Sequence, residues 1–164
     1  MCGRFYLDAK AEELAVYFEL PAVPSLKPRY NIAPSQLVTA IRVGAQGREC
    51  VSLHWGLIPF WAKDEKIGAR MINARGETVH EKASFKNAFK KRRCLVVADG
   101  FFEWQKAGKG KQPFHITMKD RKPFAFAGLW ERWTRGEQPI ESCTIVTTAP
   151  APCRNRPTTF CIME

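Results

Sequence analysis

Apolar residues recur at helical spacing in two parts of the chain. In residues 8–20 they fall on one face around Leu14, with Asp8 in position to cap the helix and Pro21 to end it. A second helix is predicted from Ser84 through the run KNAFKKRR, whose cationic residues fall in its last turn. Each helix has one apolar face, so both are expected to pack against a core.

Runs of β-branched and aromatic residues, separated by turn formers, predict strands elsewhere. Residues 37–43 and 49–58 flank the glycine-rich GAQGR and predict a hairpin. The proline-rich stretch 21–36 has no periodicity and is predicted to be an ordered loop. The other predicted strands are residues 94–98, 101–106, 113–119, 124–130 and 143–149. The pattern indicates one β-rich α+β domain without internal repeats or a linker.

The composition agrees with a folded domain and indicates which class of partner it favours. The chain has 164 residues, of which 45% are hydrophobic, enough for a substantial core. Its formal net charge of +10 favours polyanionic partners, first of all nucleic acid, although a solvated basic surface without a ligand would have the same charge. No apolar run reaches the roughly 18 residues of a membrane span.

The cysteines and histidines predict a reduced protein without a metal site. The six cysteines lie far apart with no CxxC pair, and the start MCGRFYLDAK does not resemble a signal peptide. We therefore expect a cytoplasmic protein. The three histidines stand alone, away from the paired ligands of a structural zinc site, so no metal and no other cofactor is expected.

Cys2 is the residue whose position most strongly indicates a chemical role. A small second residue allows removal of Met1, which leaves a free α-amine beside a thiol. These groups have ordinary pKa values of about 7.7–8.0 and about 8.5, so both have nucleophilic forms near neutral pH. An aldehyde would be captured as an imine and then closed by the sulfur into a thiazolidine. The alternative is an incidental cysteine at a frayed terminus.

Two polar motifs could support such chemistry. In INARGETV, Asn73 could hold an amine or a sugar hydroxyl and Arg75 could grip a phosphate, although a turn with a solvated arginine explains the stretch equally well. In ADGFFEW, Glu103 lies between two aromatic residues on a predicted strand and could shuttle protons. Strand alternation offers the competing interpretation that Glu103 faces water while its neighbours face the core.

An aromatic cluster in WGLIPFWA and several arginines suit single-stranded nucleic acid, which is bound by base stacking and by attraction of its backbone. Any one aromatic residue could equally be core packing. The residues in question are Trp55, Pro59, Phe60 and Trp61, with Arg4, Arg29, Arg70 and Arg75.

From Met1 to about Thr148 the chain resembles the SOS response-associated peptidase (SRAP) family. The resemblance rests on the ordered motifs MCGRF, YNIAPSQ, WGLIPFWAKD, INARGETV, SFKNAFKKRRCLVVADGFFEW and CTIVTT. It implies a barrel-like β-rich fold with flanking helices and a positively charged channel. It also implies an activity in the DNA damage response, the capture of abasic sites in a covalent DNA–protein crosslink. The partner would be single-stranded DNA with abasic sites, bound by a monomer.

The resemblance also implies roles for individual residues. Cys2 would be the crosslinking nucleophile, Asn73 would position its amine and the opened sugar, and Glu103 would donate and accept protons. Arg75 matches a phosphate-binding arginine. The residues expected to contact DNA are Arg4, Asn31, Pro34, Trp55, Trp61, Arg70 and Arg75.

Residues 149–164 depart from the family pattern, in which a histidine in an H-x-RMP motif and a closing strand follow the TT pair. Here the chain reads TTAPAPCRNRPTTFCIME, and no histidine matches. We treat 1–164 as one domain with an atypical tail, as a truncated or frameshifted C-terminal part would produce. This predicts slower crosslinking and a sheet edge left unpaired.

Two other classes of function remain open. The MCG start also occurs in N-terminal-nucleophile amidohydrolases, but the Gly-Asn-Asp-like oxyanion segment of those enzymes has no counterpart here. A basic single-strand binding module with an idle Cys2 would bind DNA without regard to abasic sites. The peptidase in the family name is interpreted as the self-processing that exposes Cys2, because no Cys-His-Asn/Asp protease constellation is recognisable.

Overall fold

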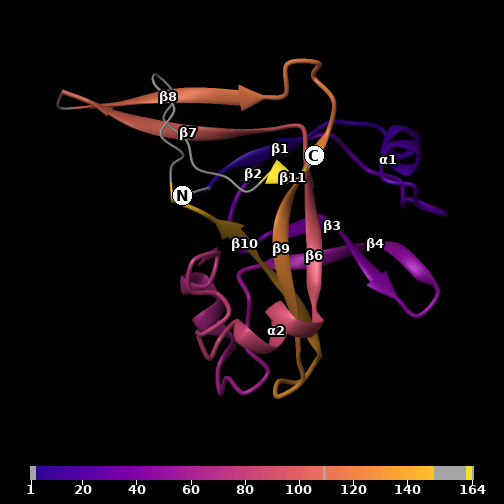
Figure 1. Ribbon diagram of the computed structural model, residues 1–164, viewed down its shortest axis with the longest axis vertical. Helices are drawn as coiled ribbons and strands as arrows, with labels where there is room; N and C mark the ends of the chain where they lie inside the picture. Colours follow the sequence, from indigo (N-terminus) through magenta and orange to yellow (C-terminus); the bar gives the residue numbers. More distant parts are fainter. Residues whose placement is uncertain (1–2, 109, 150–161, 164) are drawn as a thin grey trace.

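The computed structural model describes residues 3–108, 110–149 and 162–163. Strands are the main regular structure of this part, and short helices lie at its edges (Figure 1). Among the described residues, no helix is both long and apolar enough to span a bilayer. The predicted β-rich α+β class is confirmed.

A closed barrel forms the centre of the fold. Its strands are β3 (Leu37–Gly44), β4 (Gly47–Trp55), β6 (Arg93–Ala98), β9 (Phe124–Trp133) and β10 (Ile140–Thr147). β3 and β4 form the predicted hairpin, β6 links β3 to β9, and β10 pairs with both β9 and β4 to close the ring. Outside the ring, β5 (Asn73–Arg75) runs parallel to β10.

A second sheet lies across the upper end of the barrel in Figure 1, in the order β2-β1-β7-β8. Its strands are β1 (Phe5–Leu7), β2 (Arg29–Ile32), β7 (Gly100–Ala107) and β8 (Gly110–Thr117). Phe5 and Phe101 from this sheet are buried against barrel side chains, with ring centroids 5.2 Å from Trp55 and 5.6 Å from Phe126, respectively. Both sheets therefore share one hydrophobic core.

The chain passes from the barrel to the second sheet at Asp99. β6 ends at Ala98 and β7 begins at Gly100, so the Asp-Gly pair joins strands of different sheets. A Cβ at position 100 would lie 2.4 Å from Cε1 of Tyr6 and 2.8 Å from the carbonyl oxygen of Ile116. Glycine is required here by this close approach of β1 and β8.

The two predicted helices exist but are shorter than the pattern suggested. They are α1 (Ala11–Tyr17) and α2 (Lys86–Lys91), which buries Ala88 and carries Lys90 and Lys91 in its last turn. The predicted Asp8 cap is wrong, because the N-cap of α1 is Lys10 and no side chain caps it. Instead, Asp99 Oδ2 accepts the N–H groups of Asp8 and Ala9 at 2.7 and 2.8 Å.

Three segments differ from the sequence-based predictions. The proline-rich stretch contains β2, and a 3₁₀ helix, η1 (Glu65–Arg70), precedes β5. In the tail, β11 (Ile162–Met163) pairs antiparallel with Phe126 and Ala125 of β9. The predicted unpaired sheet edge is therefore wrong at β9, because backbone from the atypical tail occupies that position.

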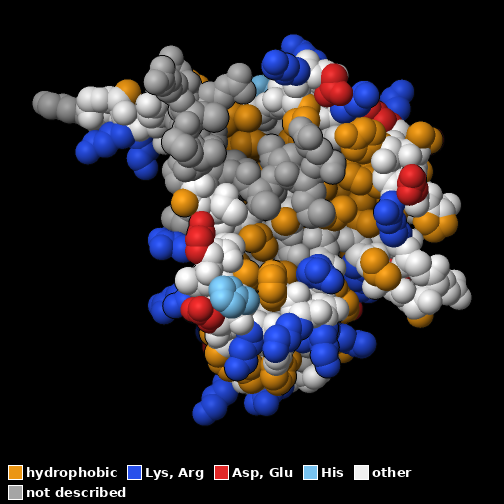
Figure 2. Space-filling model, in the orientation of Figure 1, with side chains coloured by type: hydrophobic (Ala, Val, Ile, Leu, Met, Phe, Trp, Pro, Cys, Tyr) orange, Lys and Arg blue, Asp and Glu red, His pale blue; other side chains and the backbone are white. Residues whose placement is uncertain are grey.

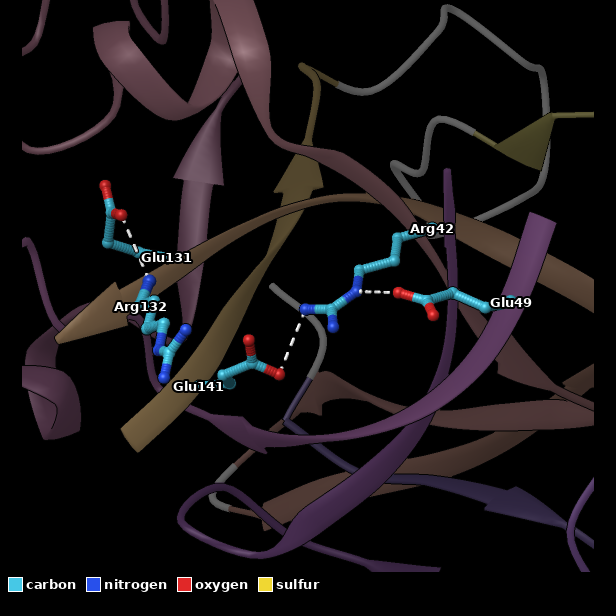
Figure 3. A network of polar contacts seen from close by, with 5 residues as sticks. All are labelled: Arg42, Glu49, Glu131, Arg132 and Glu141. Carbon is cyan, nitrogen blue, oxygen red and sulfur yellow. Dashed lines mark hydrogen bonds and ion pairs between the residues drawn. The ribbon is translucent and has the colours of Figure 1, made fainter. Parts of the chain in front are cut away.

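A polar network on one side of the barrel links three of its strands (Figure 3). Arg42 on β3 forms ion pairs with Glu49 of β4 at 2.6 Å and with Glu141 of β10 at 3.0 Å. Its guanidinium carbon lies 4.2 Å from the centroid of the Trp130 ring. These contacts connect β3 to β4 and β10, so we interpret Arg42 as structural.

Candidate active site

The start of the chain lies along β7. Phe5 pairs with Phe101, and the N–H of Phe102 donates to the carbonyl of Arg4 at 2.9 Å. This antiparallel register brings Arg4, just before β1, alongside Phe102, the neighbour of Glu103 in β7. Cys2 lies outside the described residues, which begin at Gly3.

Glu103 lies on the face of β7 that turns toward the core. Side chains alternate along a strand, so Glu103 shares its face with Phe101, which is 2% exposed. Glu103 is itself half-buried, with Oε1 shielded from solvent, whereas Trp104 on the other face is 45% exposed. The interpretation in which Glu103 faces water while both neighbours face the core is therefore wrong.

Asn73 and Arg75 lie on β5, at the carboxyl end of β10. Asn73 pairs with Ile145 and Arg75 with Thr147, and the N–H of Gly76 donates to the carbonyl of Thr147 at 2.7 Å. Asn73 is half-buried with Oδ1 shielded from solvent, and Arg75 is exposed. The motif thus presents a sheltered amide and an exposed cation on one short strand.

Trp55 connects these two parts of the site. Its ring lies 5.2 Å from that of Phe5 on β1, and its Nε1 donates to the carbonyl of Ile72, the residue before Asn73, at 2.9 Å. Trp55 is 0% exposed, so its predicted role as a DNA-contacting residue is wrong, because no face of the ring is available for stacking. Its geometry fits a scaffold that fixes β1 relative to β5.

The other aromatic prediction, Trp61, is on the surface. Trp61 is 40% exposed and its neighbour Phe60 is 45% exposed. The next residue, Ala62, is buried and its carbonyl accepts the Nε1–H of Trp133 at 2.8 Å. This contact holds the segment in place and leaves the two rings outside.

The remaining predicted contacts are also accessible. Asn31 is exposed on β2, and Pro34 is half-buried in the following turn. That turn is held against the end of β4, because the N–H of Ser35 donates to the carbonyl of Trp55 at 2.8 Å. Arg4 is half-buried, and Arg70 is exposed in the last turn of η1.

Charged groups of both signs lie near the end of β5, where Arg75 and Glu77 are both exposed. Glu77 Oε1 accepts the N–H of Ala149 at 2.6 Å. Backbone hydrogen bonds, with a contribution from Arg75, lower the pKa of Glu77 below its ordinary value. Figure 2 shows Lys and Arg side chains gathered over α2, so a group of cations also lies on that helix.

Comparison with known proteins shows the family of the chain. The family model described as SOS response associated peptidase (SRAP) matches residues 1–155. Abasic site processing protein YoaM of Bacillus subtilis is 44% identical over 92% of this chain and 68% of its own length. Abasic site processing protein YedK of Escherichia coli is 34% identical over 91% of this chain and 68% of its own length.

Solved structures show the same fold. A crystal structure of a protein from Bacteroides thetaiotaomicron superposes with a TM-score of 0.78 and 31% identity, covering 90% of this chain and 68% of that one. A protein from Bordetella bronchiseptica gives a TM-score of 0.78 at 26% identity, over 98% of this chain and 82% of that one. With its family match and its curated relatives, the chain belongs to the SRAP family.

Proposed function

We propose that this protein processes abasic sites in single-stranded DNA by forming a covalent thiazolidine crosslink through Cys2. The observation that carries the proposal is that Trp55 contacts Phe5 of β1 and hydrogen-bonds the residue before β5, while β1 pairs with β7. Asn73 on β5 and Glu103 on β7 are each half-buried, and Arg4, close to Cys2 in sequence, hydrogen-bonds Phe102 beside Glu103. The names of the curated relatives, abasic site processing proteins, support the same substrate.

The proposed chemistry forms two bonds and releases one water. After removal of Met1, the α-amine of Cys2 attacks the aldehyde carbon of the ring-opened sugar, and loss of water gives an imine. The thiol of Cys2 then adds to the same carbon, and its proton passes to the imine nitrogen. No oxidant or reductant is needed.

The neighbouring residues would serve these steps by position. Asn73 would hold the amine and the sugar hydroxyl, and Glu103 would deliver and remove the protons of imine formation. Both side chains are partly sheltered from water, which strengthens the hydrogen bonds they make. Exposed Arg75 would bind a backbone phosphate, and exposed Trp61 would stack on a base.

The test is to incubate the purified protein with an abasic single-stranded oligonucleotide and to look for a product that survives denaturing electrophoresis. Cys2→Ala should abolish the product, and Cys2→Ser should give a more labile one, because oxygen closes a less stable ring. Abasic DNA reduced with borohydride is the matched control, since its alcohol cannot form an imine. A stable product with reduced DNA, or with protein that retains Met1, would contradict the mechanism.

A further inference from the structure

The β7–β8 hairpin has a second face, opposite Glu103, that the proposed function does not use. Figure 1 shows the hairpin projecting beyond the barrel. The register pairs Phe102 with His115 and Trp104 with Pro113, and paired residues lie on the same side of the sheet. Because Glu103 turns the other way, these four side chains form the outer face of the hairpin.

Aromatic rings are grouped on this outer face. The rings of Phe102 and His115 are stacked, with centroids 5.2 Å apart at an interplanar angle of 23°, and Tyr6 lies 5.2 Å from His115. His115 and Trp104 are exposed, and Trp104 retains 45% of its surface. Flat rings at neighbouring positions of adjacent strands provide the kind of platform on which nucleobases stack.

The two ends of this face differ in charge. Toward the hairpin tip, Lys106 pairs with Lys111, and both side chains are exposed. At the other end, a cavity of about 600 Å³ next to Tyr6 and His115 is lined by three carboxylates and two cations. These charged residues are Asp8, Glu13, Asp99, Lys10 and Arg121. A phosphate backbone would thus be attracted to the tip half of the face and disfavoured at the cavity.

We propose that the outer face of the hairpin, formed by Phe102, Trp104 and His115 with Lys106 and Lys111, is a second contact for single-stranded nucleic acid. It binds the part of the strand that continues beyond the abasic sugar, by base stacking on Trp104 and by phosphate attraction to the two lysines. The proposal rests on the proposed function for the identity of that strand. The combination of exposed rings and paired cations favours nucleic acid over an acidic peptide, which would use the lysines but leave the rings without partners.

The test compares two lengths of labelled oligothymidylate with normal bases, measured by fluorescence anisotropy. A strand of about seven nucleotides fills one site, and one of about twenty can also reach the hairpin. Trp104→Ala should weaken binding of the longer strand about five-fold or more and leave the shorter one unchanged, because one stacking contact is lost. The Lys106→Glu, Lys111→Glu double variant should also reduce the salt dependence of the longer strand alone.

Phe89→Ala is the matched control, since Phe89 is an aromatic residue of α2 with 40% exposure. It should bind both lengths as the parent chain does. If Trp104→Ala lost the same affinity for both lengths, Trp104 would belong to the site that binds the short strand, and the proposal would be overturned. Unchanged binding of both lengths, or a change in oligomeric state instead, would also overturn it. Crosslinking of a short abasic strand by the parent chain tests the proposed function separately, because that strand does not reach the hairpin.

Discussion

Replacing Trp55 by phenylalanine should disturb the positions of the site residues, although the buried ring itself is not expected to contact DNA. Trp55 is fully buried, contacts Phe5 and donates a hydrogen bond to the carbonyl of Ile72. Phenylalanine keeps the aromatic packing in part but removes the donor and one ring. Asn73 follows Ile72 directly, so a shift of that carbonyl would move the amide proposed to position the reacting groups.

The expected loss of stability is modest. The void left by the missing ring costs about 1 kcal/mol, because cavities cost roughly 24 cal/mol per Å³. The lost hydrogen bond costs about another 1 kcal/mol. The carbonyl of Ile72 also accepts the N–H of Ile145 at 3.1 Å, so it keeps a partner. A total of about 2 kcal/mol should lower the melting temperature by about 4–8 °C in a domain of this size.

Urea unfolding, affinity for undamaged single strands and crosslinking rate should be measured on the same preparation. For Trp55→Phe we expect lower stability and slower crosslinking, with unchanged affinity for undamaged DNA. Trp61→Ala is the contrasting variant from the same motif, because that ring is 40% exposed, and it should lose affinity at native stability. If Trp55→Phe lost affinity while keeping its stability, burial would be the wrong basis for assigning this residue.

Three further results are expected. Glu103→Gln should slow crosslinking by roughly 10²–10⁴-fold in single-turnover gels while affinity stays unchanged, and an unaltered rate would remove Glu103 from the proton transfers. Arg75→Ala should weaken binding to normal and abasic strands alike in anisotropy titrations, and a loss confined to abasic DNA would show that Arg75 reads the lesion. Burial raises the pKa of Asp99 in the folded chain, so its ionisation opposes folding, and wild-type stability falls as pH rises from about 3.9 through the raised value. Asp99→Asn cannot ionise and should gain unfolding free energy relative to wild type over that window, and parallel pH profiles in urea unfolding would contradict this.

The sequence could predict elements whose signals are local. The β3–β4 hairpin was predicted because two long alternating runs flank a glycine-rich turn, and its register confirms this. β2 and β5 have only 4 and 3 residues, too few for a periodic pattern, and exist because β1 and β10 supply their hydrogen bonds. Such partners are set by the tertiary fold, so a short strand within the proline-rich stretch is predicted as a loop from the sequence.

The candidate site was predicted in its residue types but not in which side chains face outward. Trp55 and Trp61 belong to one motif, and the sequence of that motif does not distinguish a ring in the core from a ring on the surface. The same limit applies to the start of α1, where Asp8 has the right spacing for a cap. Instead, the N–H of Asp8 donates to the side chain of Asp99, 91 positions away in sequence, which no local pattern could indicate.

The pairing of β1 with β7 also determines when the site can form during synthesis. The first strand has no neighbour on one side until Phe101 and the residues around it have been made. Contacts this distant in sequence close late and slowly, because the intervening chain must first be ordered. A nascent chain would therefore leave the ribosome with its first residues unplaced. Enzymes that remove an initiator methionine would have access to them before the barrel closes.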